Sequence, residues 1–221
     1  MLGVMPRFII SVLGLILALA AGHAAVQEYR FFRVDTLPTA QQIQRAAQPG
    51  GRLAQTVSIR SIVAQMSFCV SAPQSLIFDL YPTDARRRFS QACQARAEHI
   101  LDRNPTLSIA HLARAVSNHQ IDDLQAAMRD LRRARASAPN EGWIARERVQ
   151  LALTLAKVGA PEARDIARAD ILMMMSERPL RRSLAGIYSQ AEDQQDFIVS
   201  VIDDAPNADQ RAFLRAVRRR R

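Results

Sequence analysis

The segment from Phe8 to Val26 constrains the fold of this 221-residue chain most, because it contains no Asp, Glu, Lys or Arg. A helix over residues 8–26 would be about 28 Å long, close to the roughly 30 Å hydrocarbon core of a bilayer. Small residues in Ala18-Leu19-Ala20 and Gly22-His23-Ala24 also fit a signal-peptidase site. The sequence therefore predicts a membrane anchor, with a cleaved signal sequence and a buried core helix as the alternatives.

Aromatic and basic residues follow the apolar segment directly. Tyr29, Phe31 and Phe32 stand beside Arg30 and Arg33, and residues of these types concentrate at membrane–water interfaces. This collar favours a retained single-pass anchor, to which we assign residues 1–33.

The side of the membrane that the rest of the chain occupies is less constrained. Arg7 precedes the apolar segment while Arg30 and Arg33 follow it, so the positive-inside rule is nearly balanced. Cys69 and Cys93 are the only cysteines, and an even number in an exported chain allows one disulfide. We therefore expect an inner-membrane protein whose soluble domain faces the periplasm. The opposite topology is the alternative.

Cys69 and Cys93 form the candidate disulfide, although both also fit as small buried hydrophobic residues. In an antiparallel hairpin about residues 73–82, Cys69 would lie near the turn and Cys93 about two helical turns further from it. Such an offset is large for a bridge whose Cα atoms usually lie about 4.4–6.8 Å apart. The sequence leaves the pairing open.

Turn signals divide the rest of the chain into a tether and a series of amphipathic helices. Residues 34–54 form the expected tether, with one short helix between Pro38 and Pro49. Residues 55–221 form the expected helical domain, since apolar side chains recur there at helical spacing. An aromatic content of only 5% argues against a sandwich or barrel. The predicted fold class is all-α, as an α-solenoid of antiparallel hairpins or a compact bundle.

The stretch from Pro105 to Pro139 carries the clearest internal pattern, because it reads as a helix, a turn, a helix and a proline. Small and aliphatic residues stand where the two helices would pack, at Leu112, Ala113, Val116, Ala127, Leu131 and Ala134. The stretch resembles a degenerate tetratricopeptide repeat, with a longer turn and without the usual large aromatics of the first helix. Residues 143–171 resemble a second, looser unit, and a non-repeating bundle is the alternative.

No pattern in the chain predicts catalysis or a metal site. His99, His111 and His119 have no partners at a recognised ligand spacing. No nucleophile motif or phosphate-binding loop is present in the sequence. We therefore expect no enzyme activity, no metal and no cofactor.

The net charge of +9 is concentrated near the ends of the chain. Residues 211–221 hold six arginines and no acid; removing these and Arg7 from the 30 basic residues leaves 23, against 21 acidic ones. Charges inside the domain, such as Arg129-Asp130, are expected to be solvated. Nucleic acid is not an expected partner, since no aromatic residues accompany the basic run. Contact with anionic lipid or an acidic partner is expected from the tail, through Arg215, Arg218, Arg219, Arg220 and Arg221.

The resemblance implies a scaffold for protein–protein interaction, in which stacked helix pairs present a groove to a peptide or to a partner's helix. Bacterial proteins of this appearance assist envelope assembly or polysaccharide export. We therefore expect a membrane-anchored periplasmic scaffold with a protein partner. The alternative is a cytoplasm-facing adaptor whose arginine tail binds anionic lipid or nucleic acid.

Overall fold

The computed structural model describes residues 5–219, which form twelve α-helices, two short 3-10 helices and no β-strand. The predicted all-α fold class is therefore confirmed. Prolines mark several of the boundaries, as the sequence predicts: Pro82 directly precedes one helix and Pro206 directly precedes the last.

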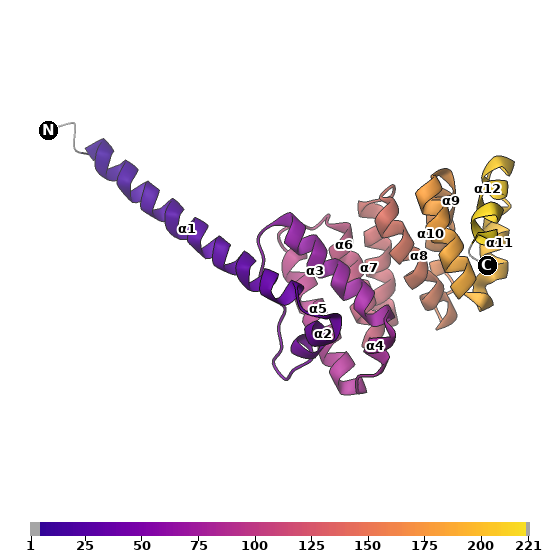
Figure 1. Ribbon diagram of the computed structural model, residues 1–221, viewed down its shortest axis with the longest axis horizontal. Helices are drawn as coiled ribbons and strands as arrows, with labels where there is room; N and C mark the ends of the chain where they lie inside the picture. The colour runs from indigo at the N-terminus through magenta and orange to yellow at the C-terminus, as the bar shows by residue number, and fades with distance from the viewer. Residues whose placement is uncertain (1–4, 220–221) are drawn as a thin grey trace.

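Helix α1, Met5–Asp35, is the one described helix that is long and apolar enough to cross a membrane. It projects away from all the other helices (Figure 1), and its large apolar side chains from Ile9 to Leu19 are exposed. The expected N-terminal hydrophobic helix is thus present. Its length and composition fit a single-pass anchor.

The last turns of α1 are fixed to the helical domain by Glu28. Its carboxylate accepts hydrogen bonds from the backbone N–H groups of Val57 and Ser58, at 2.7 and 2.8 Å, and from the Ser61 hydroxyl. These donors lie at the N-terminus of α3, Ile59–Ser71. Unpaired N–H groups and the helix dipole both favour a carboxylate at that position.

Residues 34–54, expected as a tether, pack against the domain instead of running free of it. Helix α1 continues to Asp35, and α2, Thr39–Ala46, follows after a short turn. Ile43 of α2 is fully buried in the hydrophobic core, and the Tyr81 hydroxyl donates a hydrogen bond to the Ala40 carbonyl at 2.7 Å. The segment therefore joins the anchor to the domain through packed contacts.

The remaining helices form a row of hairpins that leads away from α1 (Figure 1). The first helices of the hairpins are α3, α6 (Ser108–Gln120), α8 (Gly142–Lys157) and α10 (Arg178–Gln190). The second helices are α5 (Thr83–Leu101), α7 (Leu124–Ser137), α9 (Ala163–Ser176) and α12 (Asn207–Arg218). Shorter helices connect them: η1 (Ala72–Gln74), α4 (Leu76–Asp79), η2 (Glu192–Gln194) and α11 (Gln195–Ile202).

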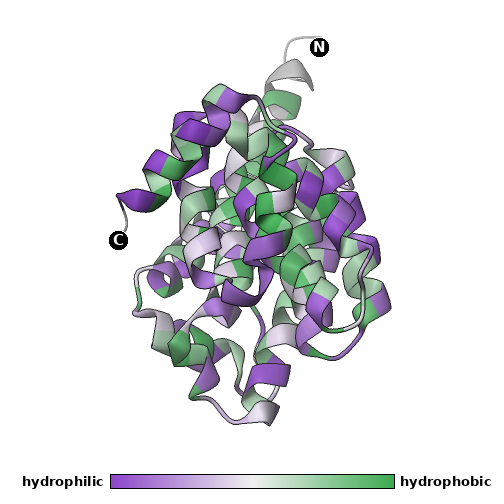
Figure 2. Ribbon diagram, turned by 90° about the vertical axis from the view of Figure 1, so that its right-hand side faces the viewer, coloured by the Kyte–Doolittle hydropathy of each residue, from purple (hydrophilic) through white to green (hydrophobic). Residues whose placement is uncertain are grey.

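One hydrophobic core runs through the whole row, from Ile43 to Val217. Figure 2 looks along the row and shows hydrophilic residues on the outer faces of the helices. Each helix is thus held by its apolar face against its neighbours. The helical hairpins are present; their classification as tetratricopeptide-like stays a prediction.

A fully buried ion pair joins two consecutive helices of the row. The Nε and Nη2 atoms of Arg148 on α8 each donate to one carboxylate oxygen of Asp170 on α9 at 2.8 Å, and neither side chain is exposed to solvent. Arg135 of α7 lies 3.1 Å from the same carboxylate. The remaining Arg148 nitrogen donates to the Ala138 carbonyl at 3.0 Å, just beyond the end of α7. Three helices therefore converge on one carboxylate.

The preceding hairpin repeats this arrangement. Arg114 of α6 donates to both oxygens of Asp130 on α7, at 2.8 and 2.6 Å. Arg114 is the seventh residue of α6 (114 − 108 + 1) and Arg148 the seventh of α8 (148 − 142 + 1). Asp130 is buried rather than solvated, so the expectation of a solvated Arg129-Asp130 face is wrong at Asp130.

We expect Arg148→Met to lower the free energy of unfolding by about 3–5 kcal/mol, because it leaves Asp170 buried without its bidentate partner. The double variant Arg148→Met/Asp170→Leu should recover much of that loss. Urea unfolding of the full chain in a neutral detergent, followed by circular dichroism, measures both. Arg132→Met is the matched control, since Arg132 pairs with Glu162 at the surface, where loss of a pair costs below about 1 kcal/mol. Equal losses in the two single variants would contradict the prediction.

Cys69 and Cys93 are bonded in the structure, with Cα atoms 5.8 Å apart and both side chains fully buried. The sequence predicts that Cys93 lies about two helical turns further from the turn than Cys69. The connection between α3 and α5, residues 72–82, explains why the two cysteines are level instead. It contains η1 and α4 and lets α5 begin well beyond the end of α3. About ten residues of α5, roughly 15 Å of helix, then run back before Cys93 is level with Cys69.

We expect no free thiol in unreduced, denatured protein, and a loss of about 3 kcal/mol of stability on reduction, because the bridge closes a loop of 24 residues. Thiol labelling followed by mass spectrometry measures the first quantity and urea unfolding the second. The variant Cys69→Ala/Cys93→Ala should unfold at the same urea concentration with or without reductant. Two titratable thiols in protein from the native membrane would refute the bridge.

Candidate functional site

A groove of about 620 Å³ runs along the first helices of the hairpins. Residues of α6, α8 and α10 line it, together with residues of η1 and η2 at its ends. The second helices α7, α9 and α12 contribute none of its lining residues. The groove is therefore formed by one layer of the row.

Apolar side chains form part of the groove's lining. Val116 of α6, Leu151 and Leu153 of α8 and Ile187 of α10 line it and are almost fully buried by their neighbours. This floor belongs to the common hydrophobic core. Its position is fixed by the same packing that holds the row together.

Side-chain amides make up half of the polar side chains that line the groove. The oxygens of Gln150 and Gln194 are buried, yet they accept no hydrogen bond from any residue within 5–219. Buried acceptors without donors are rare in folded proteins, and both glutamines are among the residues that line the groove. The glutamines that line the groove are Gln74, Gln120, Gln150, Gln190 and Gln194.

The charges of the groove largely balance, because Arg146 lies 3.8 Å from the carboxylate of Glu147 and Lys157 pairs with Asp193. Lys157 Nζ lies 2.7 Å from Asp193 Oδ2, and this contact with Lys157 lowers the pKa of the Asp193 carboxyl. Burial lowers the pKa of His119, against a smaller opposing effect of Asp122. His119 is therefore neutral at pH 7, and the groove suits a ligand without a high net charge.

A second, cationic cleft of about 240 Å³ lies at the far end of the row from α1. Arginines of α10 and of the chain's C-terminal region line it: Arg178, Arg181, Arg182, Arg215 and Arg219.

The structure places only part of the predicted arginine tail in this cleft. Arg215 and Arg219 line it, whereas Arg218 does not. Arg220 and Arg221 lie outside the described residues. Phe213, Ala216 and Val217 of α12 are buried, so this part of the tail is the polar face of a packed helix.

The histidines form no shared site. His111 is buried in α6 and its Nε2 lies 2.8 Å from the Pro105 carbonyl oxygen, while burial lowers its pKa. His119 lies in the groove and His99 lines a different cavity, beside Arg96. Among the residues that the structure describes, no three His, Cys, Asp or Glu side chains are grouped to hold a metal.

No protein family, curated protein or solved structure matches this chain in sequence or fold comparison. The groove's own chemistry therefore has to indicate its ligand. Sequence reasoning missed the glutamines, although Gln120 and Gln190 each end a first helix of the row. A glutamine at the same position of two first helices is the sequence pattern that could have indicated a shared polar surface.

Proposed function

We propose that the chain is a membrane-anchored helical scaffold whose groove binds an extended segment of a partner protein. The observation that carries this proposal is the pair of buried, unpartnered amide oxygens of Gln150 and Gln194 in a groove with an apolar floor. A buried acceptor without a donor costs about 1–3 kcal/mol. A ligand that donates hydrogen bonds there removes that cost.

The hydrogen-bond donors that an extended polypeptide presents are its backbone N–H groups. In a helical ligand these groups are already bonded within the helix, so only its side chains could donate to the glutamine oxygens. An extended segment also places alternate side chains on the apolar floor. The groove therefore favours an extended segment over a helix, and with little net charge, because Lys157 and Asp193 already pair.

We place the anchor in the inner membrane and the domain in the periplasm, since disulfides persist in oxidising compartments. One observation favours the opposite topology as a second candidate. One cavity at the domain end of α1 is lined by Arg30, Arg33, Arg45 and Arg52, and basic residues are enriched on the cytoplasmic side of a span.

The cationic cleft at α10 and α12 suits an acidic segment of the partner, because arginines line it. It lies at the end of the row far from the span, so lipid head groups do not reach it.

A fused reporter distinguishes the two topologies. We expect a reporter joined after Arg221 to be active when it requires the periplasm and silent when it requires the cytoplasm. Activity of the cytoplasmic reporter alone would reverse the assignment of the domain.

Peptide selection tests the groove. We expect random 12-residue peptides selected on the detergent-solubilised full chain to bind at least about tenfold more weakly to Gln150→Ala/Gln194→Ala, because each lost acceptor removes a hydrogen bond worth about 1 kcal/mol. Isothermal titration calorimetry gives the affinities. Gln91→Ala/Gln125→Ala is the matched control, since both of these glutamines are exposed and lie on second helices.

Methylated peptides show whether the peptide backbone is what the glutamines bind. Replacing single backbone N–H groups of a selected peptide by N-methyl groups should weaken its binding to the wild-type chain and leave its binding to the Gln150→Ala/Gln194→Ala variant unchanged. Peptides that lose the same affinity in both proteins, or that bind the glutamine variant as well as the wild type, would refute the proposed mode of binding.

A further inference from the structure

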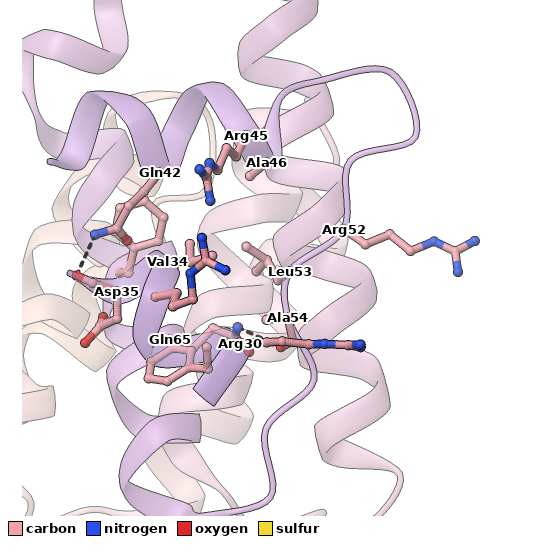
Figure 3. Close-up of a pocket in the computed structure, with 13 residues that line it drawn as sticks. Arg30, Val34, Asp35, Gln42, Arg45, Ala46, Arg52, Leu53, Ala54 and Gln65 are labelled. Carbon is pink, nitrogen blue, oxygen red and sulfur yellow. Dashed lines mark hydrogen bonds between the residues drawn. The ribbon is translucent and has the colours of Figure 1, made fainter. Parts of the chain in front are cut away.

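A pocket of about 360 Å³ lies at the junction of the anchor with the domain. It is bounded by the end of α1, by α2, by the segment that follows α2 and by α3 (Figure 3). Apolar side chains from three of these segments line it: Phe31, Val34, Leu53 and Phe68.

Four arginines surround this apolar lining. Arg30 and Arg33 come from α1, Arg45 from α2 and Arg52 from the following segment. In Figure 3, Arg30 and Arg52 extend toward the same side, whereas Asp35, the one acidic lining residue, lies at the opposite side.

None of the four guanidinium groups has a salt bridge or hydrogen bond to another residue of the described range, 5–219. Several arginines deeper in the row do, as Arg96, Arg114 and Arg148 show. The pocket therefore holds an excess of cationic charge that the protein itself does not neutralise.

The position of the pocket along α1 indicates which anions can reach its arginines, namely the phosphates of the lipid head groups. The apolar segment ends at Val26, so Arg30 lies four residues, or about 6 Å of helix, beyond it. The head-group layer on each side of a bilayer is about 5–8 Å thick. Tyr29 and Phe32 are exposed on the same turns of α1, as aromatic residues at this depth usually are.

We propose that this pocket binds the phosphate head group of an anionic phospholipid from the bilayer that holds α1. The guanidinium groups bind the phosphate oxygens, and the apolar lining accepts the glycerol and the start of an acyl chain. A lipid head group and a free phosphate ion would both bind these arginines through phosphate oxygens. Because the site lies at head-group depth, we assign the bound phosphate to a lipid.

Native mass spectrometry of the full chain in neutral detergent tests the proposal, with phosphatidylglycerol as the added probe. We expect one bound phosphatidylglycerol per chain, and a Kd raised at least about tenfold in Arg45→Gln/Arg52→Gln, because each arginine near a phosphate contributes about 1 kcal/mol. Both substituted residues are exposed and unpaired, so the variant should keep its circular dichroism spectrum. It also keeps both collar arginines of α1.

The control variant is Arg178→Gln/Arg182→Gln, which removes two arginines of the far cleft and should bind phosphatidylglycerol like the wild type. Phosphatidylcholine and inorganic phosphate are the control ligands, and both should bind much more weakly. Equal loss in the two variants, or equal binding of phosphatidylcholine, would overturn the proposal. Inorganic phosphate binding as tightly as the lipid would overturn its assignment to a membrane source.

Discussion

The buried carboxylate of Asp170 is the point on which the geometry of the row depends. It receives both forked nitrogens of Arg148 and lies beside Arg135, so α7, α8 and α9 all meet at one charge. A buried ion pair offsets its desolvation only when its geometry is nearly ideal. Three consecutive helices are therefore held together at one point, and α8, the middle first helix of the groove, is fixed against α7 and α9.

The helices of this chain and its N-terminal apolar segment could be predicted, because residues close together in the sequence determine both. Prolines and apolar periodicity locate the helices, and a run of uncharged residues identifies α1. The partners of Arg114 and Arg148 were not predictable, since each aspartate lies 16 or 22 residues away in the sequence and reads there as one of many surface charges. Only the packed hairpin brings the two charges into contact and excludes water from them.

The same limit applies to residues 34–54 and to the candidate groove. A segment with prolines and few apolar residues reads as a linker, yet burial of Ile43, Ala46 and Ala47 docks it on the domain. Glu28 likewise appears as one charge beyond the span, and its role arises only because the N-terminus of α3 reaches it. Gln74, Gln120, Gln150 and Gln190, each 30 or more residues from the next, line one groove only after the first helices align.

Arginines gather at the two ends of the row through folding, not through sequence runs alone. Arg45 and Arg52 line the same pocket as the collar arginines Arg30 and Arg33 of α1, and Arg178 and Arg182 join the C-terminal helix because α10 packs against α12. The groove between them is nearly neutral, since Lys157 and Asp193 pair across it. Phosphate held at the first end would neutralise the cations nearest the bilayer. The uncompensated positive charge would then lie at the far end, where an acidic segment of a partner leaving the groove would meet it.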